Sequence, residues 1–103
     1  MLFRSRADAF LALPGGIGTL EELYEVWTWH QLGYHRKPLG LLNAEGYFDE
    51  LLAFMKKSVE HGFLSAQQHE VLVVSDQAKS LLDRLHAQCL QTPPTPHADF
   101  KAI

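Results

Sequence analysis

The sequence predicts an α/β fold in which a parallel sheet of about three strands is flanked by three to four helices. Short apolar runs at residues 8–13, 38–42 and 71–74 alternate with longer segments of helical periodicity. This alternation is typical of parallel strands joined by right-handed crossovers. A length of 103 residues with 47% hydrophobic content suits one small domain. We expect that domain over residues 1–90 and a mobile, Pro-rich tail over residues 91–103.

Residues 8–13 are predicted to form a buried strand, because their nearly continuous apolar run is followed by a glycine turn. The main helix is expected over residues 19–33, with Gly33 at its C-terminal end. Its side chains form two stripes, one with Leu20, Leu23, Tyr24, Trp27 and Gln31, the other with Val26, Trp29 and Leu32. One sheet can cover only one of these two apolar faces. The second face, centred on Trp29, therefore predicts contacts with a partner subunit or with a further segment of the protein, whereas Trp27 is expected in the core.

After this helix, His35 and Arg36 lie in a polar link and are interpreted as solvated loop residues, with an active role as the alternative. Pro38 begins the second strand, and the turn at residues 43–46 follows it. Asn43 is interpreted as a turn former, with contact to a ligand as the alternative. The next helix is expected over residues 47–61, with a buried stripe made of Phe48, Leu51, Leu52, Met55 and Val59.

The last third of the sequence predicts a short helix, a strand and a final helix. Ser65 is expected to cap a short helix that ends at His69, and the third strand covers residues 71–74. Ser75 or Asp76 is then expected to cap a helix that runs to about Gln88. The side chains expected to face the sheet from this helix are Leu81, Leu82 and Leu85.

Composition argues against several function classes. The net charge of −3 gives no electrostatic basis for binding nucleic acid or an acidic membrane, and no apolar run reaches membrane-spanning length. The single cysteine, Cys89, excludes an internal disulfide and suits a reducing cytosol. With no secretory or transit signal visible, we expect a cytoplasmic protein. His61 and His69 lack the spacing and companions of a metal site, so no metal or other cofactor is expected.

A glycine-rich stretch, Pro14-Gly15-Gly16-Ile17-Gly18-Thr19, separates the first strand from the main helix. Glycines permit backbone conformations that a Cβ would forbid, and they let a ligand approach the main chain. The first N–H groups of a helix have no intrahelical partner, and the helix dipole favours an anion beside them. Ligands of α/β sheets bind outside the carboxyl ends of the strands, where this stretch lies. The stretch predicts a phosphate cradle, with a plain strand-to-helix turn as the alternative.

The spacing matches neither common nucleotide fingerprint, since the Walker Lys is absent and the glycines fall as G-G-x-G. Thr19 followed three residues later by Glu22 has the pattern of a helix capping box. A carboxylate beside the cradle would repel a phosphate, so Glu22 is not expected to bind it. Glu22 is either a cap or a group that acts on a sugar or a water molecule, and the pattern leaves both open.

The order Pro14-Gly15-Gly16-x-Gly18-Thr19-x-x-Glu22 resembles the signature of the Lonely guy family. These proteins are cytokinin riboside 5′-monophosphate phosphoribohydrolases, often mislabelled as lysine decarboxylases. The resemblance fades after about Leu85 and includes Ala7-Asp8-Ala9-Phe10, Trp27-x-Trp29-x-Gln31-Leu32-Gly33, His35-x-Lys37-Pro38 and Gly46-Tyr47-Phe48-Asp49. It implies a Rossmann-like fold, of which this chain resembles the C-terminal half.

The resemblance also implies a reaction, the cleavage of the N-glycosidic bond of cytokinin riboside 5′-monophosphate or AMP to free base and ribose 5-phosphate. The phosphate would be bound by Gly15, Gly16, Gly18 and Thr19. Glu22 would be catalytic, either by stabilising positive charge on the ribose or by positioning water. No cofactor is expected, and the resemblance implies that the helix of residues 19–33 contributes to a homodimer.

Family members carry a further motif, M-x-x-R-K, on a helix before the A-D-A-F strand. Counted back from Ala7, its catalytic Arg and its Lys would fall before Met1. Arg4 and Arg6 are out of register, so neither receives that role. We therefore expect the chain alone to be inactive, either as half of a longer enzyme or as a degenerate nucleotide-binding module without turnover.

Overall fold

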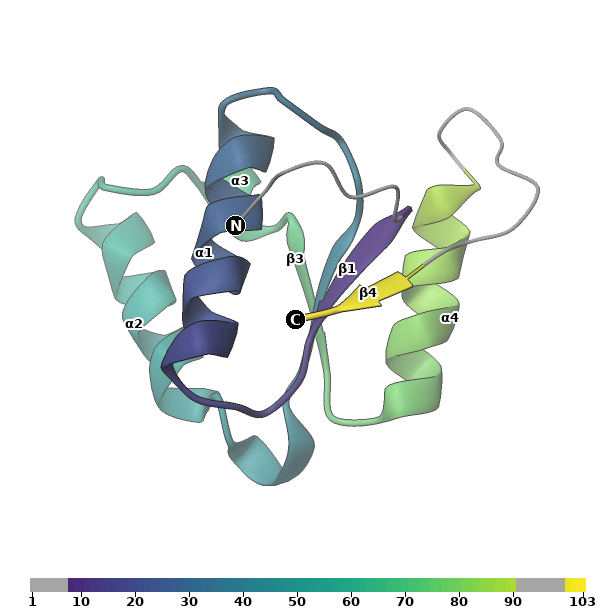
Figure 1. Cartoon of the computed structure of the whole chain (residues 1–103). Coiled ribbons are helices and arrows are strands. Elements are labelled where there is room, and N and C mark those ends of the chain that lie inside the picture. Colours follow the sequence, from purple (N-terminus) through teal and green to yellow (C-terminus); the bar gives the residue numbers. More distant parts are fainter. Residues whose placement is uncertain (1–7, 91–99) are drawn as a thin grey trace.

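The chain forms a parallel sheet with helices on both faces, which confirms the predicted α/β class. The computed structural model describes residues 8–90 and 100–103. In chain order its elements are β1 (Ala9–Ala12), α1 (Ile17–Gln31), β2 (Leu39–Leu42), the 3-10 turn η1 (Ala44–Gly46), α2 (Asp49–Glu60), α3 (Ala66–His69), β3 (Leu72–Ser75), α4 (Ala78–Cys89) and β4 (Phe100–Ala102) (Figure 1).

The strands lie in the order β3-β2-β1-β4, and every neighbouring pair is parallel. Phe10 of β1 is opposite Leu39 of β2, and on the other side of β1 Ala9 is opposite Phe100 of β4. Ile103 continues this pairing, since its N–H donates to the Leu11 carbonyl at 2.7 Å. The last residues of the expected mobile tail therefore form a strand, while residues 91–99 lie outside the described part.

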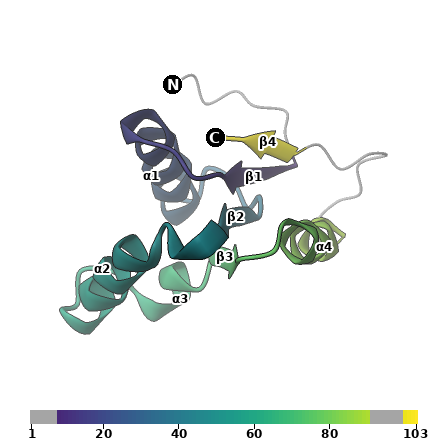
Figure 2. The same ribbon diagram turned by 90° about the horizontal axis from the view of Figure 1, so that it is seen from below.

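Side chains alternate between the two faces of the sheet because successive strand residues point in opposite directions. Phe10 and Ala12 of β1 join a core cluster with α1 and α2. Leu11 points to the other face and packs with Leu81 and Leu85 of α4. Figure 2 shows the resulting layers, with α1, α2 and α3 on one side of the sheet and α4 on the other.

Helix α1 ends as its sequence predicts. Gly33 has a φ of +85°, and its N–H donates to the His30 carbonyl, while the Tyr34 N–H donates to the Trp29 carbonyl. This pair of bonds is the Schellman motif, in which a residue without a Cβ takes the left-handed position. The core role expected of Trp27 is also confirmed, since it is buried and its Nε1–H donates to the Gln68 carbonyl at 3.1 Å.

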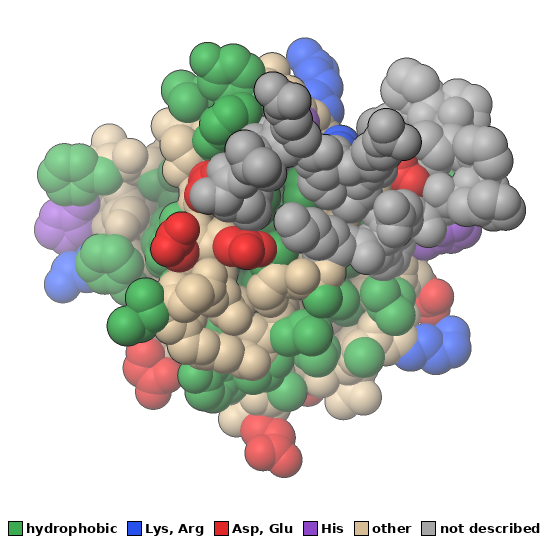
Figure 3. All heavy atoms as spheres, in the orientation of Figure 1, with side chains coloured by type: hydrophobic (Ala, Val, Ile, Leu, Met, Phe, Trp, Pro, Cys, Tyr) green, Lys and Arg blue, Asp and Glu red, His purple; other side chains and the backbone are tan. Residues whose placement is uncertain are grey.

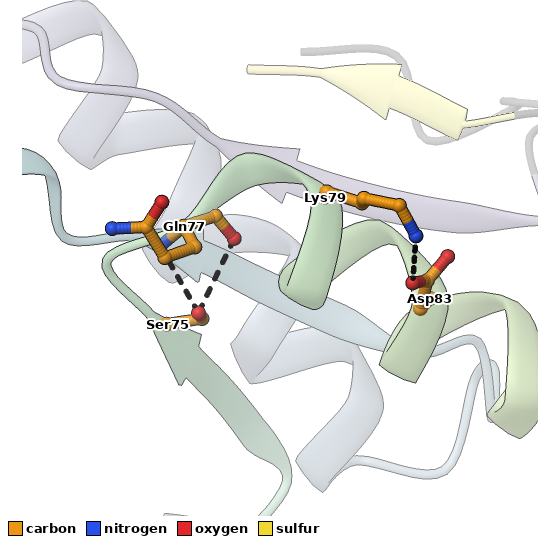
Figure 4. A network of polar contacts seen from close by, with 4 residues as sticks. All are labelled: Ser75, Gln77, Lys79 and Asp83. Carbon is orange, nitrogen blue, oxygen red and sulfur yellow. Dashed lines mark hydrogen bonds and ion pairs between the residues drawn. The ribbon is translucent and has the colours of Figure 1, made fainter.

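The predicted start of α4 is wrong. Its N-cap residue is Gln77, with no side-chain cap, so neither Ser75 nor Asp76 fills that position. The Ser75 hydroxyl instead accepts a bond from the Gln77 N–H and donates to the Gln77 carbonyl (Figure 4). This local turn at the end of β3 occupies the hydroxyl before the helix begins. One turn further on, Lys79 and Asp83 form an exposed ion pair at 3.0 Å.

The predictions for the buried side of α2, for the cap of α3 and for the sheet-facing side of α4 are confirmed with one exception. The stripe of α2 packs on the sheet through buried Phe48 and Met55, and the Ser65 hydroxyl caps α3 by accepting from the Gln68 N–H. Leu82 was expected to face the sheet but is 39% exposed, because it lies beside the buried stripe that Leu81 and Leu85 form. Among the described residues, no helix is long and apolar enough to cross a membrane.

Candidate functional site

The carboxyl ends of β1, β2 and β3 meet at one edge of the sheet, at the bottom of Figure 1. Residues 14–18, called the glycine loop here, lead from β1 into α1 at this edge and include the first two residues of the helix. Residues 43–47, called the β2 turn, follow β2 at the same edge. Because ligands of parallel α/β sheets bind outside this edge, the structure places the glycine-rich motif where a ligand site is expected.

The three glycines of the loop are not required by backbone conformation. None of them has a positive φ, in contrast to Gly33 and Gly46. A Cβ on Gly15 would lie 2.3 Å from the Thr19 Oγ1, so this position is closed to larger residues by its neighbour. A Cβ on Gly16 or Gly18 would have no atom within 4 Å. Nothing in the chain demands glycine at these two positions, and a bound group could approach the main chain there.

Helix α1 begins at Ile17, two residues earlier than predicted. Gly16 is its N-cap residue and carries no side-chain cap, and the first helical bond runs from the Leu20 N–H to the Gly16 carbonyl at 3.1 Å. Thr19 therefore lies inside the first turn, where its hydroxyl packs against Gly15. The capping-box alternative is wrong, because Thr19 is not the N-cap residue and no side chain caps the helix.

Because α1 begins before Thr19, Glu22 is not part of a helix cap, and the catalytic alternative is left for it. The side chain is half-buried and lies three residues after Thr19 and four after Gly18, on the same face of the helix. The first turn of α1 carries no acidic residue, so its free N–H groups are not opposed by an adjacent carboxylate. Figure 3 shows acidic side chains over the middle of α1, above its first turn. Glu22 lies about one helical turn beyond the start of α1.

The β2 turn contacts the glycine loop through a residue that the sequence analysis did not single out. The Tyr47 hydroxyl donates a hydrogen bond of 2.6 Å to the Gly15 carbonyl. The turn itself is held by Asn43, whose Oδ1 accepts from the Phe48 N–H at 2.7 Å and whose Nδ2 donates to Asp49 at 2.8 Å. The turn-forming role predicted for Asn43 is confirmed. Tyr47 appeared in the sequence only within the Gly46-Tyr47-Phe48-Asp49 resemblance, which gave no sign of this contact.

His35, expected in a solvated loop, is instead buried. Its Nδ1 accepts a bond from the Lys37 N–H at 3.0 Å, so its Nε2 carries the proton and donates to the Val26 carbonyl at 2.8 Å. Burial lowers the pKa of His35 below its ordinary value. The ring lies between the end of α1 and the start of β2, at the edge of the sheet opposite the glycine loop. Its role is therefore structural, while Arg36 is exposed as expected.

Two other features are separate from the glycine loop. A hollow of about 360 Å³ lies between α2 and β3 and is lined mainly by apolar side chains, including Leu52 and Leu72. An apolar lining has few hydrogen-bond donors for a phosphate. We therefore place the candidate site at the main-chain N–H groups of the glycine loop. Cys89 is half-buried with its Sγ 3.6 Å from the Asp8 carbonyl, and burial raises the pKa of its thiol. No group of three or more potential metal ligands occurs in residues 8–90 and 100–103.

Comparison with known proteins agrees with this arrangement. The model of a family described as "Possible lysine decarboxylase" matches residues 1–85. The chain belongs to this family. Its Arabidopsis thaliana relatives LOG7 and LOG3, both named cytokinin riboside 5′-monophosphate phosphoribohydrolase, are 56% identical over 80 residues and 55% identical over 85 residues. The predicted membership of the Lonely guy (LOG) family is confirmed.

The LOG-family match covers most of this chain but less than half of each relative. The alignments include 78% of the chain and 37% of LOG7, and 81% of the chain and 40% of LOG3. In Oryza sativa subsp. japonica, the probable phosphoribohydrolase LOGL5 is 52% identical over 91 residues, which is 88% of the chain and 35% of that protein. The chain thus spans about two fifths of the length of these curated relatives.

Proposed function

We propose that this chain supplies the phosphate-binding loop and the catalytic carboxylate of a nucleoside 5′-monophosphate phosphoribohydrolase. The reaction would cleave the N-glycosidic bond of cytokinin riboside 5′-monophosphate or AMP and release the free base and ribose 5-phosphate. The names of the relatives support this reaction class. The structural observation that carries the proposal is the open space over Gly16 and Gly18 at the start of α1.

In the proposed site, the substrate phosphate lies over the glycine loop and the first turn of α1. Main-chain N–H groups at Gly15, Gly16 and Gly18 and the Thr19 hydroxyl are its donors. A helix N-terminus favours an anion through its unpartnered N–H groups and its dipole. Side chains at Gly16 and Gly18 would fill the space that the phosphate needs, which explains why these positions are glycine although the fold does not require it.

Glu22 would act on the ribose, one helical turn away from the phosphate. As the bond between C1′ and the base nitrogen breaks, positive charge develops on the ribose ring, as in glycoside hydrolysis. A carboxylate can stabilise this charge, or it can accept a proton from the water that attacks C1′. Either role requires the ionised form. We assign no residue of this chain to protonation of the departing base.

Because no residue of this chain is assigned to protonation of the departing base, a second candidate function is favoured. The described residues include the proposed phosphate cradle and carboxylate, and we assign none of them to assistance of the leaving base. A module that binds nucleoside monophosphates without turnover would need only the cradle. The two functions differ in whether base is released at all.

The test of turnover is base release from AMP by this chain and by the chain fused to the remaining residues of a longer LOG relative. We expect Glu22→Gln in the fusion to lower the rate of base release by about 10²-fold or more, because the charge is lost while the shape is kept. Glu21→Gln is the matched control, since Glu21 is the exposed neighbouring carboxylate. A Glu22→Gln fusion with most of its turnover intact would remove the catalytic assignment.

We further propose that the protein is a cytoplasmic homodimer that contacts its partner through the helix of residues 19–33. The support is the apolar surface at the end of α1, where Leu32 and Tyr34 are 63% and 67% exposed. Trp29, the expected centre of this surface, is half-buried and packs against the Tyr34 ring with centroids 5.0 Å apart.

A further inference from the structure

We propose that Tyr47 is a positioning residue for the phosphate site, because its hydroxyl fixes the orientation of the peptide between Gly15 and Gly16. This inference rests on the proposed function of the glycine loop and adds a residue from another element to it. Its basis is the hydrogen bond of 2.6 Å from the Tyr47 hydroxyl to the Gly15 carbonyl. This contact joins segments 32 residues apart in the sequence.

Because a peptide bond is planar, the contact with the Gly15 carbonyl also fixes the direction of the Gly16 N–H. A trans peptide is planar, and its C=O and N–H point in opposite directions. No cis peptide occurs in the described residues. With the Gly15 carbonyl directed at Tyr47, the Gly16 N–H points away from Tyr47. The hydroxyl therefore decides the direction of a donor in the proposed phosphate cradle without touching the phosphate.

This peptide needs an external restraint more than others do. It joins two glycines, and glycine populates regions of φ and ψ that other residues avoid, so little prevents the peptide from rotating. A reversed peptide would place a carbonyl oxygen where the cradle presents an N–H, and the oxygen would repel a phosphate. The bond from Tyr47 favours the orientation that suits an anion.

Tyr47 is itself held firmly enough to serve this purpose. Its N–H donates to the Ala44 carbonyl at 3.0 Å, and its ring packs edge-on against Phe48 with centroids 5.0 Å apart. Phe48 is only 3% exposed, and its N–H is bound by the Asn43 side chain at 2.7 Å. A chain of contacts thus runs from the core through the β2 turn to the glycine loop. The Tyr47 side chain remains 54% exposed, so its removal creates no cavity.

The test compares the wild-type chain with Tyr47→Phe, which removes only the hydroxyl. Binding of AMP and of adenosine is measured by calorimetry, and the ratio of the two affinities reports the phosphate contribution alone. We expect the wild type to prefer AMP and Tyr47→Phe to lose roughly threefold to tenfold of that preference, the size expected for one lost hydrogen bond. A protein whose binding-competent state is less populated binds proportionally more weakly. Adenosine affinity should be unchanged.

A second readout and a matched control accompany this comparison. In ¹H–¹⁵N spectra, the Gly16 amide signal of Tyr47→Phe should broaden or split, because the peptide then exchanges between two orientations. Tyr34→Phe also removes one exposed tyrosine hydroxyl, but at the opposite end of α1, and should match the wild type in both measurements.

The outcomes separate this inference from the function on which it rests. A wild type that binds AMP and adenosine equally would overturn the phosphate site, and the role of Tyr47 would fall with it. A wild type that prefers AMP, together with a Tyr47→Phe variant that keeps the full preference and a sharp Gly16 signal, would overturn the role of Tyr47 alone. Equal weakening of both ligands with a lower melting temperature would show that Tyr47 only stabilises the fold.

Discussion

Gly15 and Gly18 lie three residues apart, yet the structure gives them different reasons to lack a side chain. At Gly15 an added Cβ would meet the Thr19 Oγ1 at 2.3 Å, whereas at Gly18 it would meet nothing within 4 Å. The first is a packing constraint within the chain. The second leaves room for something outside it.

Alanine substitutions should separate these reasons. Gly15→Ala should destabilise the fold by about 1–3 kcal/mol through overpacking and lower the melting temperature by several degrees. Gly18→Ala should leave stability unchanged or raise it by up to about 1 kcal/mol, since alanine is the better helix former. It should nevertheless weaken AMP binding. Thermal unfolding and calorimetry provide the measurements, and a Gly18→Ala variant that binds AMP normally would argue against the cradle.

For single residues, the sequence could predict a site role where the residues lie within one local motif. The glycines, Thr19 and Glu22 occur within a short stretch, so their spacing carried the prediction. Two features depended on tertiary contacts that spacing does not encode. Tyr47 meets Gly15 across 32 residues, and His35 is buried only because α1 and β2 close around it.

Among the secondary-structure elements, the junction between α1 and β2 depends on a neutral histidine. His35 uses both ring nitrogens, one to bind the Val26 carbonyl and one to accept from the Lys37 N–H. Protonation at Nδ1 would remove the acceptor and place a charge in a buried site next to His30 and Lys37. Burial accordingly lowers the pKa of His35, and it lowers that of His30 in the same way.

The sign of the resulting pH dependence follows from these shifts. An unfolded histidine has a pKa of about 6.5, above the folded values, so between the two the unfolded chain binds more protons. The free energy of unfolding should therefore fall as the pH drops below about 6.5. His35→Gln should show a smaller fall, with the remainder due to His30. Urea unfolding between about pH 5 and pH 7.5 is the measurement, and equal pH dependence in both proteins would contradict this role.

Element types were predictable from periodicity, whereas element ends were less so. The three strands and the buried stripe of α2 follow from runs and repeats that survive in the fold. The start of α1 was misplaced because Thr19 and Glu22 offered a plausible cap, whereas the helix begins at Ile17 with Gly16 as an N-cap residue that has no side chain. β4 was missed because Phe100–Ala102 are too few residues to carry a strand pattern.

Considered as a whole, the molecule restricts how a second chain could pair with its sheet. On one side, β4 pairs with the edge of β1. The terminal strand on the other side is β3, where Arg84 donates to the Val74 carbonyl at 2.8 Å. Such a side-chain bond blunts the edge against further strands. We therefore expect a dimer to form through the exposed apolar residues at the end of α1 and not through the edge of β3.

We expect the wild type to be a dimer and Leu32→Glu to shift it toward the monomer, because a charge would be buried in an apolar contact. Light scattering over a range of protein concentrations measures the effect. Leu90→Glu is the matched control, since Leu90 is 73% exposed and lies at the end of α4. Should the wild type be monomeric throughout, or should both variants behave alike, the proposed interface is misplaced.

The all-parallel sheet also governs the order in which the chain can assemble. Parallel neighbours cannot be joined by a hairpin, so each pairing requires a crossover and the closure of a loop. β1, β2 and β3 follow one another with one or two helices between them, but β4 pairs with β1 from the opposite end of the sequence. During synthesis, β1 can therefore pair with β2 before the residues of β4 have been made, and its other edge stays unpaired until then. The strand that leads into the glycine loop is thus paired on its two sides at different times.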